Sequence, residues 1–321
     1  MRQIPLRERV KQAFKRGAAL AKRAASRQLS RRAPQWDGPL ICVAMVRNEI
    51  DILDLWLSHL LALFDRVVIH DHRSTDGTRA RLLELAAHQP ALEVRLYDGE
   101  AYIQSELMTA TFHEIAASTP AGWLFFLDAD EFLLIRSREA LRALLRAHRG
   151  ATTVRAGWIN AHAVVPGAVL DAGTRVAGWH LLPRNQSKIA VNLALAEGIT
   201  RIDVGNHSVR FNAPPLLRNV DILRILHLPV RSEAQVRAKV ALGYPAAASA
   251  YPGTGYAAHW KLMGAQEALD DLGFCAFNYG AFDRAGLMRV APPRESLDAP
   301  IGTLVALEPG KLSVPHLVAS A

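Results

Sequence analysis

The stretch from Trp123 to Phe132 reads Trp-Leu-Phe-Phe-Leu-Asp-Ala-Asp-Glu-Phe. Its first five residues are all large and apolar, without the alternation of a strand that has one wet face. The run therefore predicts a strand that is buried on both faces of a parallel sheet. It ends on Asp128, Asp130 and Glu131. Because ligands of such sheets bind at the carboxyl ends of the strands, we expect these carboxylates at a ligand site.

The pair of Asp128 and Asp130 predicts a site for a divalent cation. In an extended backbone, residues two apart lie on the same side, which brings the two carboxylates together. Crowded carboxylates repel one another unless a cation neutralises them, and their oxygens are ligands that Mg²⁺ and Mn²⁺ accept. The alternative is that the two Asp residues only form a turn or cap a helix.

Strand-like and helix-like segments alternate around this stretch. Strands are expected at 40–46, 66–70, 92–97 and 123–127, and helices at 50–63, 76–88, 104–118 and 137–148. Helices of this length between strands imply right-handed crossovers and a largely parallel sheet, so the predicted class is α/β. Periodicity weakens later, where we expect a strand at 152–158 and helices at 233–242 and 256–272.

The composition excludes several classes of protein. A chain of 321 residues that is 50% hydrophobic can bury a large core, which excludes disorder throughout. Cys42 and Cys275 are the only cysteines, so neither a disulfide framework nor a thiolate zinc site is indicated, which fits a reducing cytoplasm. No apolar run approaches the ~18 residues that span a bilayer, and no signal-peptide core is present. We therefore expect a chain that neither crosses a membrane nor is exported by that route.

The net charge of +8 is concentrated in a tail. Residues 1–35 hold 11 Lys and Arg against the single acid Glu8, which leaves 27 basic and 29 acidic residues for the rest of the chain. A helix here would carry a shallow apolar stripe between basic residues, a pattern that suits an anionic membrane surface. The alternatives are a solvated flexible tail or contact with nucleic acid, although the aromatic platforms of a single-strand binder are missing.

A second apolar strand ends on Asp71 and is followed by Ser74-Thr75-Asp76-Gly77. Helix capping and turn formation would explain that four-residue segment by themselves. Asp71 differs, because it stands at the end of the second strand, beside the end of the first strand at 47–49. An acid at that position can accept hydrogen bonds from a nucleotide base or ribose.

These segments together resemble a known enzyme family. Met-Val-Arg-Asn-Glu (45–49), the segment 71–78 and Leu-Asp-Ala-Asp-Glu-Phe (127–132) resemble, in order and spacing, the glycosyltransferase family 2 type of GT-A enzymes, in a subgroup with an Asp-x-Asp-Glu-Phe motif. The resemblance covers about residues 39–135 well. It is looser around Lys188, Gly-Asn-His (205–207), Leu-His-Leu-Pro-Val-Arg-Ser (226–232) and Lys239.

The resemblance implies a GT-A fold, which is Rossmann-like, with a mostly parallel central sheet flanked by helices. It also implies transfer of a sugar from a nucleotide-diphosphate donor to an acceptor hydroxyl, usually with inversion, with Mn²⁺ or Mg²⁺ as cofactor. By the same resemblance Asp71 would contact the base. The nucleotide-sugar site would comprise Asn48, Glu49, Asp71, Asp128 and Lys188, and the metal ligands would be Asp128, Asp130 and His227, or His207 in place of His227.

The sequence departs from the family in two places. The Gln-x-x-Arg-Trp element of processive members is absent, which predicts a non-processive enzyme, and no Glu-Asp motif marks the usual catalytic base. Glu131 and Asp203 are the candidates for that base, with Glu197 as a third, although a structural or surface role fits each of them better. Four basic residues, Arg184, Lys188, Arg231 and Lys239, could face the phosphates or simply lie on a solvated surface. His162, His180 and His207 fit core or surface histidines better than ligands, whereas His227 follows another apolar run.

Three other functions share part of this pattern. A haloacid-dehalogenase-type phosphatase would need Thr or Val where Phe132 stands and would carry its motif on the first strand. A nucleotidyltransferase typically has a Gly-rich basic loop after the first strand, where Arg47-Asn48-Glu49 stands. A non-catalytic nucleotide-sugar-binding or membrane-associated scaffold protein stays open, because the base is unassigned.

The sequence thus predicts three parts: a basic tail at 1–36, a GT-A glycosyltransferase domain at 37–245 and a helical extension at 246–321. We expect a cytoplasmic enzyme at the inner face of a membrane, acting in cell-surface glycan assembly on a glycan or lipid-linked acceptor, without nucleic-acid contact. Its choice of donor and acceptor would depend on loops between 159 and 232, where the sequence is least patterned.

Overall fold

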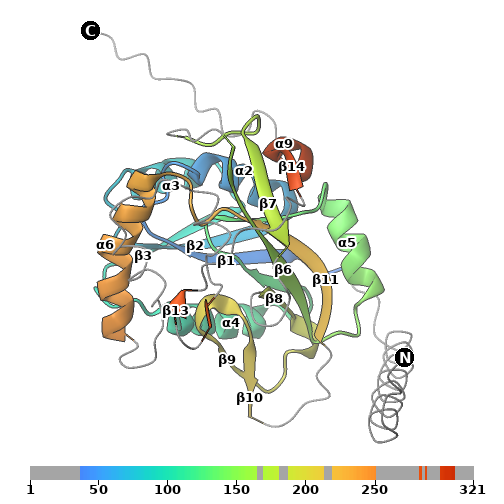
Figure 1. The fold of residues 1–321 in the computed structure, drawn as a ribbon. Coiled ribbons are helices and arrows are strands. Elements are labelled where there is room, and N and C mark those ends of the chain that lie inside the picture. The colour runs from blue at the N-terminus through green and yellow to red at the C-terminus, as the bar shows by residue number, and fades with distance from the viewer. Residues whose placement is uncertain are drawn as a thin grey trace, which may run out of the picture.

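The computed structural model describes residues 37–164, 169–180, 187–212, 219–250, 282–283, 286–287 and 297–307. The strands of this region form one large sheet with helices on both faces, and two small two-stranded sheets lie beside it (Figure 1). None of the described helices is both long and apolar enough to cross a membrane. The α/β class predicted from the sequence is confirmed, with helices flanking a central sheet.

Half of the large sheet is parallel. Its strands lie in the order β4, β1, β2, β3, with every neighbouring pair parallel; the bounds are β1 (Leu40–Val46), β2 (Arg66–His72), β3 (Leu92–Tyr97) and β4 (Trp123–Phe126). The connecting helices are α2 (Leu53–Leu63), α3 (Thr78–Ala86) and α4 (Gln104–Ser118). All residues of β1 and β4 are buried, as the unbroken apolar runs predict for central parallel strands.

The other half of the sheet is mainly antiparallel. From β4 outward it continues through β8 (Ser187–Asn192), β6 (Thr153–Ala163), β7 (Arg175–His180) and β14 (Leu297–Pro300), with each neighbouring pair antiparallel. β11 (Asn219–His227) lies parallel to β6 and antiparallel to the short β5 (Glu131–Leu133). Antiparallel neighbours need no crossover helix, which explains why helical periodicity fades after residue 159.

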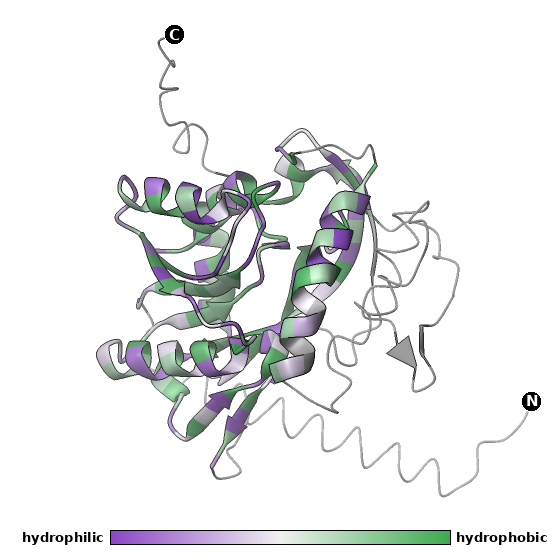
Figure 2. Cartoon of the chain, turned by 90° about the vertical axis from the view of Figure 1, so that its left-hand side faces the viewer, coloured by the Kyte–Doolittle hydropathy of each residue, from purple (hydrophilic) through white to green (hydrophobic). Residues whose placement is uncertain are grey.

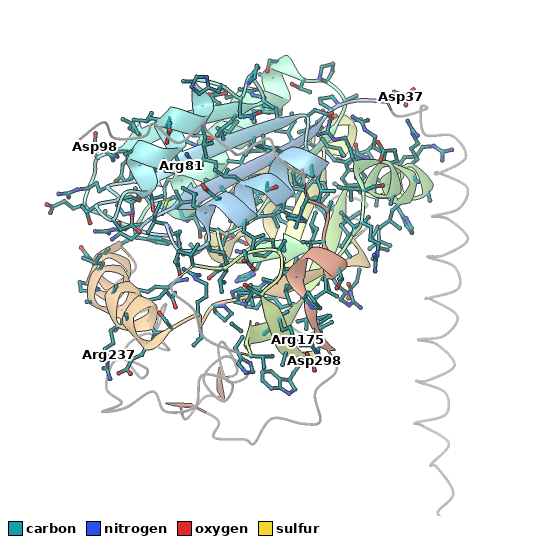
Figure 3. All side chains as sticks on the ribbon, turned by 90° about the horizontal axis from the view of Figure 1, so that it is seen from above. Asp37, Arg81, Asp98, Arg175, Arg237 and Asp298 are labelled. Carbon is teal, nitrogen blue, oxygen red and sulfur yellow. The ribbon has the colours of Figure 1, made fainter. Side chains whose placement is uncertain are left out.

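The remaining elements lie around this sheet. They are α5 (Arg138–Ala147), α6 (Glu233–Ala250), α9 (Ile301–Leu304), the 3₁₀ turns η1 (Leu193–Leu195) and η2 (Val204–Asn206), the pair β9 (Ile199–Ile202) and β10 (Val209–Phe211), and the pair β12 (Phe282–Asp283) and β13 (Gly286–Leu287). At the far edge of the sheet, Arg175 of β7 donates to Asp298 of β14 at 2.6 Å (Figure 3).

The core consists of two apolar layers, one on each face of the sheet. Side chains alternate along β1: Leu40, Cys42, Ala44 and Val46 join one cluster, and Ile41, Val43 and Met45 join the other. Helices α2, α3 and α5 cover the first layer and α4 covers the second. Figure 2 shows hydrophobic residues along the central strands, while the helices that cover them carry hydrophilic residues on part of their surface.

The division into three parts remains a prediction. The tail at 1–36 and the helix expected at 256–272 lie outside the described residues. Helix α6 continues through the expected boundary at 245/246, and within the described part of 246–321 strand β14 joins the large sheet beside β7.

Candidate functional site

The carboxyl ends of β1, β2 and β4 meet at one edge of the sheet, because the three strands are parallel neighbours. We call this the carboxyl edge. The turn after β2 is tied to the end of β1: Asn48 N donates to Ser74 Oγ at 3.0 Å, Thr75 N donates to Asn48 Oδ1 at 2.7 Å, and Glu49 N donates to Thr78 Oγ1 at 2.9 Å. The polar residues of the second motif therefore hold two strand ends together, in addition to starting a helix.

Asp71 is completely buried at the end of β2. Its Oδ2 atom accepts from Arg79 Nε at 2.5 Å and from Ser74 N at 3.4 Å. Its Oδ1 atom has no hydrogen-bond partner among the residues that the structure describes. A buried acceptor without a partner is costly and rare in a folded protein, so this atom is a candidate contact for a ligand.

Two neighbours of Asp71 carry similar atoms. Nε of Arg47 and Nδ1 of His72 are buried and, within the described parts of the chain, have no hydrogen-bond partner. His72 Nε2 lies 2.9 Å from the carbonyl of Gly99 and must donate to it, which leaves Nδ1 as an acceptor. Burial lowers the pKa of His72, so the ring stays neutral. The ends of β1 and β2 thus offer one donor and two acceptors.

Asp128 is held by two buried side chains. Gln104 Nε2 donates to its Oδ1 atom at 3.0 Å, and Lys188 Nζ donates to its Oδ2 atom at 2.5 Å. Burial disfavours the charged form of Lys188, but Asp128 and Glu131 raise the pKa of its ammonium above the usual value. One third of the Asp128 side chain remains exposed, so this carboxylate can still be reached from solvent.

The side chain of Asp130 is buried and lies near the ammonium group of Lys239 and the imidazole ring of His227. Lys239 Nζ of α6 donates to its Oδ2 atom at 2.8 Å, and His227 Nε2 lies 3.7 Å from its Oδ1 atom. Burial alone would raise the pKa of Asp130, but Lys239 holds it below its usual range. Burial lowers the pKa of His227 to about 3 despite the charge of Asp130, so the imidazole is neutral. His227 Nδ1 lies 2.8 Å from Asn160 Oδ1 and donates to it, which places the ring's lone pair on Nε2.

Glu131 follows Asp130 in the chain and contacts the backbone of Asp128. It is fully buried; its Oε2 atom accepts from Asp128 N at 3.0 Å, and its Oε1 atom is 3.6 Å from Lys188 Nζ. Burial raises the pKa of Glu131 well above its usual value, although the charge of Lys188 opposes the shift. Its contacts support the backbone of Asp128.

Glu49, which was expected to contact the nucleotide sugar, pairs with an arginine. Arg231 is buried; it donates to Glu49 and makes two bonds to Asp51, at 2.7 and 2.9 Å. Lys239 Nζ lies 3.8 Å from Glu49 Oε1 and so connects Glu49 with Asp130. Burial raises the pKa of Glu49, while Arg231 opposes the shift. Lys188, Arg231 and Lys239, which the sequence left either facing the phosphates or on a solvated surface, thus have carboxylate partners.

The other candidates from the sequence lie around this centre. Asp203 accepts from Ser208 Oγ and Arg210 Nε, both at 2.6 Å, within the segment that links β9 to β10. Glu197 is exposed after η1. His207 Nδ1 lies 3.0 Å from Ser187 O, and its ring packs edge-on against Trp158. His162 stacks on Trp179. Arg184 and the side chain of His180 lie outside the described residues.

Gln104 and Arg79 belong to the site and were not predicted. Gln104 starts α4 and bridges Asp128 to Gly205, because its Oε1 atom accepts from Gly205 N at 3.1 Å. Arg79 holds Asp71 and also donates to Asp98 at 2.8 Å; Figure 3 shows Asp98 at the periphery of the molecule. Neither residue has a sequence signal, since both roles depend on contacts between distant segments.

The donor atoms at Asp130 fit a divalent cation. No group of three or more His, Cys, Asp or Glu side chains is arranged as a metal site in the described ranges. However, Asp130 Oδ1 and His227 Nε2 are 3.7 Å apart, a separation that an ion about 2.1 Å from each atom can bridge. Mg²⁺ commonly takes one or two carboxylates from a protein and its other ligands from substrate phosphates and water. The residues therefore fit an ion that is completed by a phosphate ligand.

Comparison with known proteins gives only distant similarity. No family model matches the chain, and no curated protein sequence matches it. Among solved structures, the chain is similar to the mannosyltransferase PcManGT from Pyrobaculum calidifontis in complex with GDP-Man and Mn²⁺, with 15% identity over 70% of this chain and 72% of that chain and a TM-score of 0.38.

Two further structures are similar at a lower level. GalNAc-T7 with UDP, GalNAc and Mn²⁺ has 12% identity over 61% of this chain and 45% of that chain, with a TM-score of 0.35. HddC from Yersinia pseudotuberculosis has 6% identity over 59% of this chain and 95% of that chain, with a TM-score of 0.34. The first of these three structures is named as a mannosyltransferase, and the first two contain Mn²⁺ with a nucleotide or nucleotide sugar. The likenesses are weak, and the function is therefore inferred from the residues of the site.

Proposed function

We propose that this chain is a metal-dependent glycosyltransferase that moves a sugar from a nucleotide-diphosphate donor to an acceptor hydroxyl, with inversion and without processivity. One observation carries the proposal: at the carboxyl edge, the buried Asp71 Oδ1 atom has no hydrogen-bond partner in the described residues, and its strand β2 is separated only by β1 from β4, the strand that leads to Asp128 and Asp130. An acceptor for a base beside carboxylates for a phosphate-bound cation is the arrangement that a nucleotide-diphosphate ligand requires.

In this proposal, one group of residues binds the nucleoside and another holds the metal ion. Asp71 would bind the nucleoside, with Asn48, His72 and Arg47 shaping the same strand ends. Asp130 and His227 would hold Mn²⁺ or Mg²⁺. Such an ion supplies a Lewis acid that neutralises the charge developing on the departing diphosphate.

Asp128 would take part in the same charge balance. It is the more exposed carboxylate of the pair, and Lys188 and Gln104 fix its orientation. Lys188 therefore belongs to the donor site through Asp128.

The base that removes the proton from the acceptor hydroxyl is proposed among two carboxylates. Glu131 is adjacent to the centre, although its burial favours the protonated carboxyl, which must lose its proton before it can act as a base. Asp203 lies in the segment that also carries Gly205, whose carbonyl accepts from Lys188. Substitution by the corresponding amide, Glu131→Gln or Asp203→Asn, should lower kcat with little effect on donor KM for whichever residue is the base.

The direct test is a screen of nucleotide sugars for thermal stabilisation in the presence of Mn²⁺, followed by metal-dependent hydrolysis of the stabilising donor. A ligand at 100 times its dissociation constant stabilises a protein by about 2.7 kcal/mol, which is readily detected. Stabilisation with hydrolysis supports the enzyme. Stabilisation without hydrolysis or transfer would support the non-catalytic binding protein instead, and release of pyrophosphate from a nucleoside triphosphate would support a nucleotidyltransferase.

Asp71→Ala tests the observation on which the proposal depends. The donor KM should rise about tenfold while kcat changes little, because a contact remote from the reacting carbon acts equally in ground and transition states. Asp98→Ala is the matched control, since it removes the other acid that Arg79 contacts and leaves Asp71 in place. If Asp71→Ala bound the donor with normal affinity, residues 71–78 would only form a turn and cap the following helix.

Residues 1–36 are proposed as an electrostatic membrane anchor that brings the enzyme to a glycan or lipid-linked acceptor at the cytoplasmic face, for cell-surface glycan assembly. The support is the charge of residues 1–35, which hold 11 Lys and Arg and one acid. Deleting residues 1–35 should abolish sedimentation with anionic vesicles and keep turnover of soluble substrates. Full-length protein should detach toward ~0.5 M salt, where the screening length is about 4 Å. Equal binding by the truncated chain would place the anchor elsewhere.

A further inference from the structure

The side chain of Asn206 is fully buried, yet its polar atoms make no hydrogen bond to the described residues. Neither its Nδ2 nor its Oδ1 atom has a hydrogen-bond partner among the described residues. Folding strips water from a buried amide, and an amide that gains no partner in exchange destabilises the protein. No contact among the described residues therefore explains why the polar amide of Asn206 is buried.

The backbone at Asn206 is also in an unfavourable conformation that its surroundings enforce. Its φ is 59°, and that of the preceding Gly205 is 74°. Gly205 is held at both polar atoms, since its N donates to Gln104 Oε1 at 3.1 Å and its O accepts from Lys188 Nζ at 2.8 Å. A Cβ atom at Gly205 would lie 2.5 Å from His207 Nε2, so only glycine fits there. The loop is therefore fixed in place by Gln104 and Lys188 and depends on a glycine at position 205.

The side chains that fix this loop are the same two that fix Asp128. Gln104 Nε2 donates to Asp128 Oδ1 at 3.0 Å, and Lys188 Nζ donates to Asp128 Oδ2 at 2.5 Å. Each of them thus bridges the loop and the carboxylate. The position of Asn206 is therefore set relative to the centre at which the sugar–phosphate bond would break.

Trp158 connects the loop to the other side of the centre. Its ring lies edge-on to His207 with centroids 5.5 Å apart and stacks on His227 with centroids 4.2 Å apart. His207 follows Asn206 in the chain, and His227 faces Asp130. The loop that carries Asn206 is therefore linked to Asp128 through Gln104 and Lys188, and to Asp130 through Trp158 and His227.

We propose that Asn206 binds the sugar of the donor through two neighbouring hydroxyl groups and so selects the sugar; this rests on the function proposed above. A primary amide has two N–H donors and one acceptor, which complement a hydroxyl that accepts and a neighbouring hydroxyl that donates. A phosphate would satisfy only the donors and leave Oδ1 without a partner. An uncharged ligand with vicinal hydroxyls satisfies both, so the ligand class is a pyranose with a free diol.

The test compares each nucleotide sugar with its own nucleoside diphosphate. Thermal midpoints and dissociation constants are measured with Mn²⁺ for UDP against UDP-glucose and for GDP against GDP-mannose, in wild type and Asn206→Leu. Leucine matches the shape of asparagine and has no polar atoms. We expect the variant to bind the nucleoside diphosphate normally and the preferred nucleotide sugar about tenfold or more weakly, the loss of one hydrogen-bonded contact in a buried site. Its midpoint without ligand should fall only slightly, because leucine is strained at φ 59° but no hydrogen bond within the described residues is lost.

Asn192→Leu is the matched control. Asn192 is buried as well, but its amide is fully used: Nδ2 donates to Arg149 O at 2.9 Å and Ala151 O at 3.2 Å, and Oδ1 accepts from Ala194 N at 3.2 Å. This variant should have a lower midpoint and an unchanged preference for the nucleotide sugar. The two asparagines should therefore respond in opposite ways.

Several results would overturn the proposal. If Asn206→Leu lowers the midpoint as Asn192→Leu does and keeps the sugar preference, the amide binds a structural water and has no role in recognition. If wild type binds each nucleotide sugar no better than its nucleoside diphosphate, the sugar is not recognised by Asn206. If neither member of any pair binds wild type, the proposed function fails, and the role of Asn206 fails with it.

Discussion

The two edges of the parallel half of the sheet both contain acidic and basic residues. They differ in whether the polar atoms of these residues have hydrogen-bond partners within the protein. We call the edge at which the amino ends of these parallel strands meet the amino edge. There Asp65 precedes β2, and both of its carboxylate oxygens accept hydrogen bonds. Oδ2 accepts from Leu40 N at 2.8 Å and from Arg142 at 2.6 Å, and Oδ1 accepts from Arg138 at 3.0 Å. Arg138 gives its other donors to carbonyls at the end of α2, those of Leu61, Ala62 and Phe64. Helix ends leave such carbonyls unpaired, so this cluster completes the fold.

The carboxyl edge keeps several polar atoms without partners, whereas near the amino edge the described residues include one such atom, Trp123 Nε1 at the start of β4. In the described part of the chain, those at the carboxyl edge include Asp71 Oδ1, Arg47 Nε and His72 Nδ1. The non-glycine residues with positive φ in that part are Asn48, Arg73 and Asn206, which follow β1, follow β2 and precede His207. Each such conformation costs about 1–3 kcal/mol. A protein keeps unpaired atoms and strained residues together where a ligand compensates for them, so the contrast separates a structural edge from a functional one.

The presence of a cavity does not by itself distinguish the functional edge from the structural one. A cavity of about 650 Å³ opens at the amino edge, with Asp65, Ser137 and Arg138 among its lining residues. Yet all three of these side chains are already hydrogen-bonded to the protein, Ser137 as the cap of α5. The state of the polar groups therefore says more about function than the presence of space.

The largest effect is expected at the carboxyl edge, from Asp130→Asn. Turnover should fall about 100-fold or more, since roughly 3 kcal/mol of metal-mediated stabilisation is lost. Stability should change little, because the Lys239 partner is 22% exposed and can reach water. The measurements are metal-dependent hydrolysis of the donor and Mn²⁺ affinity by calorimetry.

Asp128→Asn provides the comparison for that variant. It should lose activity as well, but it should also be destabilised by about 3 kcal/mol, because Lys188 is 1% exposed and would keep its charge without a full counter-charge. Near-normal turnover and Mn²⁺ affinity in both variants would remove the metal from the proposed mechanism.

The second prediction concerns the amino edge. Asp65→Ala should lower the free energy of unfolding by about 2–3 kcal/mol, because it leaves Leu40 N and two arginines without their acceptor, while turnover per folded molecule stays unchanged. Urea denaturation gives the stability, and assays of the soluble fraction give the turnover. Asp54→Ala is the control: Asp54 makes two bonds to Arg81, but its side chain is 52% exposed, so its loss should cost less than about 1 kcal/mol. If Asp65→Ala lost activity in proportion to the Asp130 variant, the two edges would not differ in role.

The sequence predicted the carboxyl edge well and the partners of its residues poorly. The apolar runs before Asp71 and Asp128 placed both acids at strand ends, because local pattern determines strands and the parallel order determines which ends meet. The partner of Asp128, Lys188, lies 60 residues away, and the partner of Glu49, Arg231, lies 182 residues away. Such pairings depend on the antiparallel half of the sheet and on α6. No local periodicity specifies those contacts, so the sequence left open whether the same lysines and arginine face the phosphates or lie on a solvated surface.

The smallest effect concerns how β5, the strand behind the carboxyl edge, is held in place. His59 of α2 is fully buried and bonded on both sides: its Nδ1 donates to Ala306 O at 2.9 Å, and its Nε2 accepts from Leu133 N of β5 at 2.9 Å. Only the neutral ring can make both bonds, since a protonated Nε2 would face another N–H group. Consistent with this, burial lowers the pKa of His59 from 6.5 to about 4.

The sign of the pH effect follows from that shift. Between pH 6.5 and about 4 the unfolded chain binds a proton that folded His59 does not, so stability is full above 6.5 and falls as the pH drops toward 4. His59 should contribute at most about 2 kcal/mol of loss between pH 7 and pH 5. In His59→Gln, whose amide can also donate and accept, urea denaturation should show a flatter dependence. A residual slope should remain from His70, His207 and His227, whose pKa values burial also lowers. An unchanged slope would mean that the attachment of β5 does not depend on the neutral state of His59.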